Sequence, residues 1–420
     1  MDLTSKDKLT IFDGAIGTEV QKRPPGSGGN ITDALNLTQP EVIVAIHKDY
    51  LSAGAQVLTT NTFSSNEIRL SRSGYGDKVS EINETGVRLA RRAVAEVHGK
   101  EGEKLAVAGS IGPTGETLNP IGDWTFDQFY EAFRAQAGAL KRGGADFIIV
   151  ETMESLREAT AALIAARDVG LPVISSLSYG DRGRTSYGVV PESGAITLDH
   201  LGADVLAINC GTGPQSYPEI IKTYFRASSK PLVAEANAGN PRLEEGKAVY
   251  DLSPEDYLDG IRPGLEFLSG VGSCCGSDPR FTELLAEATR ELRVNSARER
   301  TVDNNFITNN STVIPISEVT DPLEIEMEAE DLTDLSKKVD ANRVNLVRLL
   351  DITHPYADLE KILSRQFLRL RSSKPLGVVT DDPNLLEVFL KAYPGIAPVK
   401  ATGKQDKLKG VADRYGGLLI

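Results

Sequence analysis

Eight short apolar runs alternate with helix-like stretches along residues 9–293, and this rhythm constrains the fold more than any other feature of the sequence. Strands that are apolar on both faces and are separated by helices form parallel sheets. Eight such units over this length predict a (β/α)8 barrel, or TIM barrel, with an open doubly wound sheet as the alternative that the pattern also allows. The runs cover residues 9–12, 57–63, 105–113, 146–152, 172–178, 205–210, 231–237 and 271–275.

Polar side chains gather where these apolar runs end. In a barrel of parallel strands the C-terminal strand ends form one face, and active sites are built on that face. The prediction therefore brings residues that are far apart in sequence to one ring. They are Asp13, Asn61, Thr62, Glu151, Ser178, Asn209, Cys210, Glu235, Asn237, Cys274 and Cys275.

All three cysteines of the chain lie in glycine-rich turns after such runs. Cys274 and Cys275 are adjacent, which disfavours a disulfide between them because the Cβ atoms must be separated and properly aimed. Three thiolates with one open position are typical of a catalytic zinc site. The spacing alone equally allows three buried cysteines that never meet. Cys210 ends the sixth predicted strand and the pair ends the eighth, and this placement on one ring favours the zinc site.

Composition narrows the class of protein. The chain has 420 residues, 40% of them hydrophobic and 25% charged, which is ordinary for a soluble globular enzyme. A net charge of −13 without a basic stripe argues against binding to nucleic acid or to an anionic membrane surface. The sequence shows neither a signal-peptide pattern nor an apolar run of membrane-spanning length. Three cysteines suit a reducing compartment, so we expect a cytoplasmic protein.

Two domains joined by a linker are predicted: the barrel over residues 1–294, the linker over 295–330, and a small α/β domain over 331–420. Asparagine pairs and an acidic run over 324–331 interrupt the rhythm and suggest the linker, although residues 312–316 could form a first strand of the next unit. Beyond it, strand-like runs over 343–350, 375–380, 396–401 and 417–420 alternate with helical stretches.

Taken together, the motifs resemble the homocysteine-binding domain of homocysteine S-methyltransferases, closest to the cobalamin-dependent methionine synthase type. They cover the whole predicted barrel in the family's order. One departure is Gly272-Ser273, where the family usually has two glycines. The matching motifs are Asp13-Gly14-Ala15-Ile16-Gly17-Thr18, Thr60-Asn61-Thr62-Phe63, Gly109-Ser110-Ile111-Gly112-Pro113-Thr114-Gly115, Glu151-Thr152-Met153, Ile208-Asn209-Cys210 and Cys274-Cys275-Gly276.

This resemblance implies that Cys210, Cys274 and Cys275 bind Zn²⁺ and are the catalytic centre, with the sulfur of homocysteine at the open position. Zinc would convert the substrate thiol to the nucleophilic thiolate. The resemblance further implies that Asp13 and Glu151 hold the substrate ammonium. Substrate contacts are also implied for Gly14, Ala15, Gly17, Thr18, Asn61 and Asn209. Asp13 and Glu151 could instead cap the following helices, and the two asparagines could simply satisfy backbone groups at the barrel mouth.

The C-terminal residues resemble the first half of a pterin-binding barrel, in the stretches 339–346, 373–380 and 413–417. The opening Asn-Pro-Thr-Gly type motif of that family is absent from them. We therefore expect this unit to serve as a docking module or as the dimerisation module of a homodimer, rather than as a folate site.

For the methyl group, we expect a methyl-corrinoid (methylcobamide) carried by a separate protein. The alternatives are S-methylmethionine or another small donor, a different thiol acceptor, or a non-catalytic zinc scaffold that binds a partner.

Overall fold

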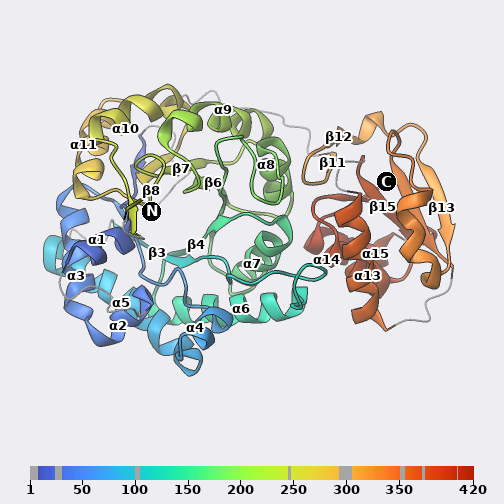
Figure 1. Cartoon of the computed structure of the whole chain (residues 1–420), viewed down its shortest axis with the longest axis horizontal. Helices are drawn as coiled ribbons and strands as arrows, with labels where there is room; N and C mark the ends of the chain where they lie inside the picture. Colours follow the sequence, from blue (N-terminus) through green and yellow to red (C-terminus); the bar gives the residue numbers. More distant parts are fainter. Residues whose placement is uncertain are drawn as a thin grey trace.

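The computed structural model describes residues 8–23, 31–99, 105–244, 247–292, 305–350, 355–370, 374–403 and 405–420. Its larger unit is the predicted barrel (Figure 1). Eight parallel strands follow one another around it in chain order, and β1 pairs with the last of them. A bridge between Phe12 and Val57 joins β1 to β2, with Asp13 N donating to Val57 O at 3.1 Å. The strands are β1 (Thr10–Ile11), β2 (Val57–Thr59), β3 (Ala106–Ile111), β4 (Phe147–Met153), β5 (Val173–Leu177), β6 (Val205–Asn209), β7 (Leu232–Ala236) and β10 (Gly270–Ser273).

Helices surround this sheet. Local sequence explains where they begin and end: α6, for example, starts with a capping box between Thr125 and Gln128 and stops at Gly144, whose φ of 95° favours glycine. The helices of the barrel are α1 (Ile16–Lys22), α2 (Leu35–Thr38), α3 (Pro40–Ser52), α4 (Glu67–Arg72), α5 (Val79–His98), α6 (Phe126–Gly143), α7 (Leu156–Asp168), α8 (Pro191–His200), α9 (Tyr217–Ala227), α10 (Pro254–Ile261) and α11 (Pro279–Thr289).

Two apolar layers hold the barrel together. Alternate residues of a strand point to opposite faces, so Phe147 and Ile149 of β4 pack inside the barrel while Ile148 and Val150 pack against the helices. This two-sided burial is the reason that the strands read as continuous apolar runs.

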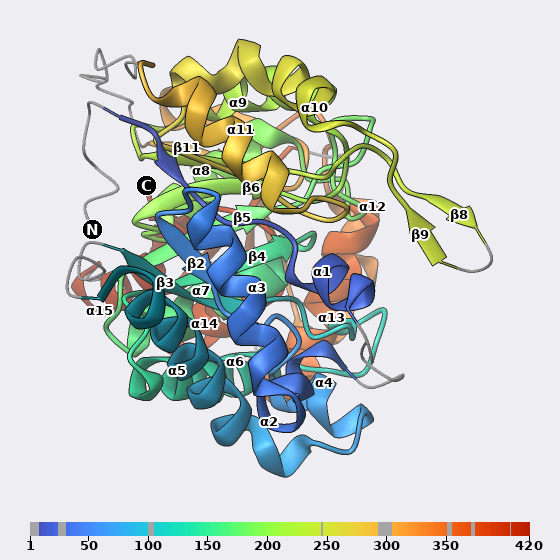
Figure 2. The same cartoon turned by 90° about the vertical axis from the view of Figure 1, so that its left-hand side faces the viewer.

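A hairpin interrupts the barrel after β7. Its strands β8 (Arg242–Glu244) and β9 (Lys247–Val249) are antiparallel, and Figure 2 shows the hairpin projecting away from the body of the molecule. No pattern in the sequence predicts this hairpin. Tyr250 follows directly, and a Cβ on Gly276 would lie 2.2 Å from its ring, so the segment after the hairpin returns to the cysteine loop.

The C-terminal unit lies beside the barrel (Figure 1). Its five parallel strands also follow chain order, and helices pack on one face around a second core. The elements are β13 (Leu323–Met327), β14 (Asn345–Leu349), β15 (Leu376–Thr380), β16 (Ala397–Ala401) and β17 (Gly417–Leu419), with α12 (Leu335–Lys338), α13 (Tyr356–Arg369), α14 (Pro383–Ala392) and α15 (Asp406–Tyr415).

Charged side chains occupy the other face of this sheet. Lys400 of β16 pairs with Glu324 of β13, although β14 and β15 lie between them. In a flat sheet these strands would be about 14 Å apart, so the ion pair requires a sheet that curls toward this face. Arg348 of β14 completes the cluster through Glu324 and Glu326.

The predicted linker contains regular structure. Residues 293–304 lie outside the described residues, but β11 (Phe306–Thr308) and β12 (Val313–Pro315) form an antiparallel hairpin. β13 lies inside the acidic run and is the first strand of the C-terminal sheet. Residues 312–316 thus form a hairpin strand rather than the first strand of that sheet. Leu323, Ile325 and Met327 alternate with two glutamates, and basic residues on β14 and β16 pair with those glutamates, which is why so acidic a segment is a strand.

Buried polar contacts join the two units. Arg157 of α7 donates to Glu360 of α13 at 2.9 Å, and both side chains are about nine-tenths buried. Arg157 also donates to the carbonyl of Lys391, and Thr197 bonds Thr308 at 2.8 Å. At the edge of the interface Arg414 pairs with Asp168. The units are therefore packed through specific bonds rather than only tethered.

No helix within the described ranges is long and apolar enough to cross a membrane.

Candidate functional site

The three cysteines meet at the mouth of the barrel. Cys210 directly follows β6, and Cys274 and Cys275 follow β10. Their Sγ atoms all lie within 4.8 Å of one another, and those of Cys210 and Cys275 are 4.0 Å apart. The three thiols are free and half-buried. Sulfurs bound to one tetrahedral zinc at about 2.3 Å are about 3.8 Å apart, so this arrangement fits a three-thiolate zinc centre.

The backbone at this centre is held in uncommon conformations. Cys210 and Thr152, at the ends of β6 and β4, have φ values of 57° and 60°. Neither is glycine, so each conformation costs of order 1–3 kcal/mol and persists only when its surroundings fix it. For Cys210 these fixing contacts are the amide, which donates to Glu235 O at 2.9 Å, and the carbonyl, which accepts from the Tyr217 hydroxyl at 2.8 Å. The fold thus aims this thiol at the other two.

The thiols influence one another. Contacts with Cys210 and Cys275, together with burial, hold the pKa of Cys274 well above that of a free thiol. Hydrogen bonds from Cys210 and Cys274 lower the pKa of Cys275. Two thiol donors therefore stabilise the thiolate form of Cys275. Ionising all three cysteines would require a cation beside them.

Asp13 is buried beside this centre. It follows β1, and its Oδ2 accepts from Thr59 N at 2.8 Å. Burial raises the pKa of Asp13 to about 8 despite that bond. Within the described residues it forms no salt bridge. A buried carboxyl group without a cation is prepared for a positively charged ligand, because such a ligand would restore its ionised form.

Glu151 on β4 is the second acid. Ser110 Oγ donates to its Oε1, and Asn209 Nδ2 donates to its Oε2 at 3.0 Å. Burial raises the pKa of Glu151 to about 7. Asn209 Oδ1 accepts from Thr152 N at 2.8 Å and from Ser176 Oγ at 2.7 Å, so Asn209 has partners on both amide atoms and orients Glu151.

The glycine turn after β1 closes the opposite side. A Cβ on Gly14 would lie within 2.9 Å of the hydroxyls of Ser273, Ser277 and Tyr50, so only glycine fits there. α1 then begins at Ile16, and the backbone N–H groups of its first turn have no partner within the helix. Thr18 Oγ1 accepts from Gly276 N at 3.0 Å, which links this turn to the cysteine loop.

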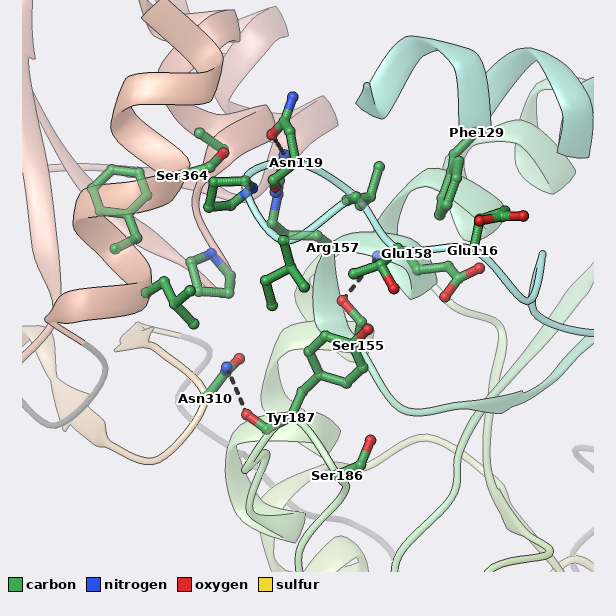
Figure 3. Close-up of a pocket in the computed structure, with 18 residues that line it drawn as sticks. Glu116, Asn119, Phe129, Ser155, Arg157, Glu158, Ser186, Tyr187, Asn310 and Ser364 are labelled. Atoms are coloured by element: carbon green, nitrogen blue, oxygen red, sulfur yellow. Dashed lines mark hydrogen bonds between the residues drawn. The ribbon is translucent and has the colours of Figure 1, made fainter. Parts of the chain in front are cut away.

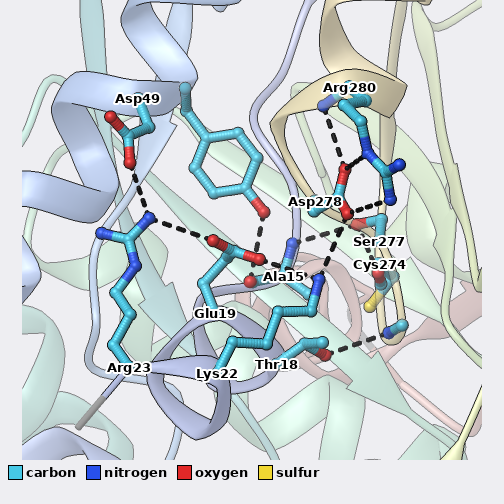
Figure 4. Close-up of polar contacts among 12 residues, drawn as sticks. Ala15, Thr18, Glu19, Lys22, Arg23, Asp49, Cys274, Ser277, Asp278 and Arg280 are labelled. Atoms are coloured by element: carbon cyan, nitrogen blue, oxygen red, sulfur yellow. Dashed lines mark hydrogen bonds and ion pairs between the residues drawn. The ribbon is translucent and has the colours of Figure 1, made fainter.

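An ion-pair network holds α1 in place (Figure 4). Lys22 bridges Glu19 at 3.0 Å and Asp278 at 3.2 Å, and Arg23 joins Glu19 to Asp49. Asp278 caps the helix that follows the cysteine pair. The turn over residues 14–18 and the cysteine loop are therefore positioned together.

All of the site residues predicted from the sequence line one pocket of about 230 Å³, namely Asp13, Gly14, Ala15, Gly17, Thr18, Asn61, Glu151, Asn209, Cys210, Cys274 and Cys275. Asn61 lies at its edge, where Nδ2 donates to Thr32 O at 2.9 Å and to Asn36 Oδ1 at 3.1 Å. Both amide donors of Asn61 are thus used to hold the neighbouring segment over residues 32–38.

The pocket also contains residues that the sequence analysis does not assign to the site. Ser110 binds Glu151, and it lies in one of the glycine motifs. Glu235 is buried, and burial raises its pKa well above the usual range. Its position near the end of an apolar run is the sequence feature that could have assigned it to the site. Ser273 is the departure from the double-glycine pattern, and its buried Oγ has no hydrogen-bond partner.

Comparison with known proteins gives a consistent result for the barrel. The family model described as homocysteine S-methyltransferase matches residues 10–289. The methionine synthase of Mycobacterium tuberculosis (strain ATCC 25618 / H37Rv) is 31% identical over 307 residues, which cover 70% of this chain and 25% of that protein. The methionine synthase of Mycobacterium leprae (strain TN) is 30% identical, over 68% of this chain and 24% of that protein. The chain thus spans about a quarter of the length of these relatives.

Solved structures support the fold. The metallated form of the homocysteine methyltransferase MmuM from Escherichia coli matches with a TM-score of 0.58 and 22% identity, over 68% of this chain and 98% of that one. Its oxidised form matches with a TM-score of 0.57 and 23% identity, over the same shares. These similarities confirm the barrel predicted from the sequence.

Proposed function

The chain belongs to the homocysteine S-methyltransferase family, and from this premise we propose that it methylates the thiol of homocysteine to form methionine. The observation that carries the proposal is the cluster of three thiols in one pocket with two carboxyl groups, those of the buried Asp13 and the half-buried Glu151. Thiolate ligands match zinc, and the carboxyl groups match the ammonium of an amino acid.

We assign the metal to Cys210, Cys274 and Cys275. Zinc bound there would supply a Lewis acid that lowers the pKa of a substrate thiol and a position at which that thiol is held. The three protein thiolates donate charge to the metal, so a sulfur held beside them stays nucleophilic. The three protein thiols are half-buried, so a methyl donor can reach a substrate sulfur held beside them from the solvent side.

The remaining pocket residues orient the amino acid. Asp13 and Glu151 receive the ammonium, which compensates charge that is otherwise buried without a cation. The N–H groups at the start of α1, which have no partner within the helix, donate to the carboxylate, with Gly14, Ala15, Gly17 and Thr18 in contact. Asn209 keeps Glu151 in place, and Asn61 holds the loops at the edge of the pocket.

In the reaction, the substrate thiol loses its proton and its sulfur forms a bond to the methyl carbon. The bond between that carbon and the donor breaks, and its electron pair stays with the donor. We propose a methyl-corrinoid on a separate protein as the donor. Support comes from the methionine-synthase-type motifs and from the 31% identity to a methionine synthase.

Turnover tests this proposal. Zinc-loaded protein is incubated with homocysteine and, separately, with methylcobalamin, S-methylmethionine or methyltetrahydrofolate, and methionine is measured. We expect methionine from methylcobalamin alone. Methionine from S-methylmethionine would overturn the corrinoid donor but keep the thiol chemistry, and methionine from methyltetrahydrofolate without corrinoid would overturn our reading of the C-terminal unit. No methionine from any donor would contradict the methyltransferase proposal.

A further inference from the structure

A second cavity lies at the junction of the two units, apart from the cysteine pocket. Its volume is about 420 Å³, against about 230 Å³ for that pocket. Figure 3 shows side chains from the loops of the barrel on one side and from α13 of the C-terminal unit on the other. No residue assigned above to the metal or to homocysteine lines it.

Apolar side chains surround this junction cavity. Ile121, Leu368 and Tyr187 line it while remaining 61%, 43% and 36% exposed, and they are three of the five large hydrophobic residues that the described surface exposes. Phe129 and Phe367 form buried parts of its wall. Exposed apolar groups that gather around one concavity indicate a ligand with an apolar body, because scattered ones would need no explanation.

Two polar atoms in the wall lack partners. Ser364 is 3% exposed, and its Oγ forms no hydrogen bond. Asn310 donates through Nδ2 to the carbonyl of Tyr187 at 3.1 Å, but its buried Oδ1 has no partner. Buried polar atoms are normally satisfied, so these two are candidates for bonds to a ligand.

The charged groups of the wall decide the chemical class of that ligand. Among the described residues, Arg157 is the one lysine or arginine in the wall, and its guanidinium already donates to Lys391 O, Asn119 O and Glu360. The described part of the wall therefore offers no free cation to an anion. Two carboxyl groups, Glu116 and Glu158, lie near one another at one end (Figure 3).

Glu158 is the deeper of these acids. Its Oε1 accepts from both the amide and the hydroxyl of Thr114 at 2.8 Å. Its side chain forms no salt bridge within the described residues, and burial raises its pKa to about 7. Glu116 pairs with Arg72 at 2.9 Å.

We propose that the junction cavity binds a small organic amine, with its apolar body against Ile121, Tyr187 and Leu368 and its ammonium directed to Glu158. The hydroxyl of Ser364 and the Oδ1 of Asn310 take further polar atoms of the ligand. Such a ligand contacts both units at once and thus stabilises their packing.

Calorimetric titration of the full chain tests this inference with three probes that share an indole ring. Tryptamine carries the ammonium, 3-methylindole is neutral, and indole-3-acetate is an anion. We expect tryptamine to bind most tightly, 3-methylindole about tenfold or more weakly, and indole-3-acetate not at all. Equal affinity for the amine and the acid, or no binding of tryptamine, would overturn the proposal.

Variants locate the binding. Glu158→Gln keeps an acceptor for Thr114 but removes the charge, and we expect it to weaken tryptamine about tenfold or more. Ser364→Ala removes an unpartnered hydroxyl, so it preserves the fold, and should weaken binding severalfold. Ile121→Ala should do the same, whereas Leu350→Ala, an equally apolar and exposed site outside the cavity, should change nothing. Tryptamine binding that is unaffected by the three cavity variants would place it elsewhere and contradict the inference.

Discussion

In the barrel, the carboxyl groups of the buried Asp13 and the half-buried Glu151 have no lysine or arginine partner among the described residues, whereas in the C-terminal sheet Glu324 is paired with Arg348 and Lys400. Both units repeat strand and helix in chain order. The barrel keeps two carboxyl groups without a cation at the strand ends, next to three thiols, and burial favours their neutral forms. The C-terminal sheet neutralises its own charge. The difference teaches that the proposed binding of a metal and an amino acid depends on thiol and carboxyl groups left without a cation, not on the repeated unit itself.

The largest effect should follow from breaking the thiol cluster. Cys274→Ser should lose bound zinc and lower methionine formation by about 1,000-fold or more, because one ligand of three is removed from the nucleophile's site. Zinc content by mass spectrometry and turnover check this. Arg348→Gln in the C-terminal sheet is the matched control and should change neither. If both variants lost zinc and turnover equally, the proposed difference between the barrel and the C-terminal sheet would be contradicted.

The junction should give the next largest effect. Glu360→Gln leaves Arg157 as a buried charge without its partner and should destabilise the packing of the units by about 3–5 kcal/mol. Urea unfolding with probes in each unit measures this. The control Asp168→Asn breaks the half-exposed pair with Arg414 and should cost less than about 1 kcal/mol. Similar costs for the two variants would show that the units are only loosely joined.

The third largest effect should come from removing the carboxyl group of Asp13. Asp13→Asn should weaken homocysteine binding by about 10–100-fold, the value of a charged hydrogen bond. Titration calorimetry on zinc-loaded protein measures the affinity.

The pH dependence provides an internal check. Folding raises the pKa of Asp13 from 3.8 to about 8 and that of Glu151 from 4.5 to about 7. Both groups take up protons on folding, so the ligand-free protein should lose stability as the pH rises from about 4 to about 8. Homocysteine should restore that stability, and Asp13→Asn should flatten the profile. An Asp13→Asn variant whose profile keeps the slope of the unmodified protein would contradict the account.

A smaller effect is expected at Ser273, whose hydroxyl reaches the glycine turn where we place the substrate carboxylate. Ser273→Gly should raise the KM for homocysteine about 3–10-fold with little change in kcat. Ser175→Ala is the control, since that hydroxyl is also buried without a partner but lies outside the pocket. If the two variants behave alike, Ser273 has no part in binding.

The smallest effect should come from the C-terminal charge cluster. Lys400→Met removes a half-exposed ion pair and should change the free energy of unfolding by less than about 1 kcal/mol, with turnover unchanged. Denaturant titration and the methionine assay check both. A large loss of turnover would mean that this face takes part in the reaction.

Much of the barrel could be predicted because each strand is apolar on both faces and ends in a glycine turn. The same reasoning placed Asp13, Glu151 and the three cysteines at one mouth, and the structure brings them into one pocket. It failed for β13, because the glutamates of that strand find their partners on strands that come later in the chain. The junction cavity and the free hydroxyl of Ser364 also depend on packing between distant segments, which no local pattern records.

Zinc K-edge X-ray absorption, recorded with and without homocysteine, tests the central claim most directly. The account predicts three sulfur neighbours at about 2.3 Å in the zinc-loaded protein and a fourth when homocysteine is added. Fewer than three sulfurs, or a spectrum unchanged by homocysteine, would contradict a three-cysteine zinc centre that receives the substrate thiol.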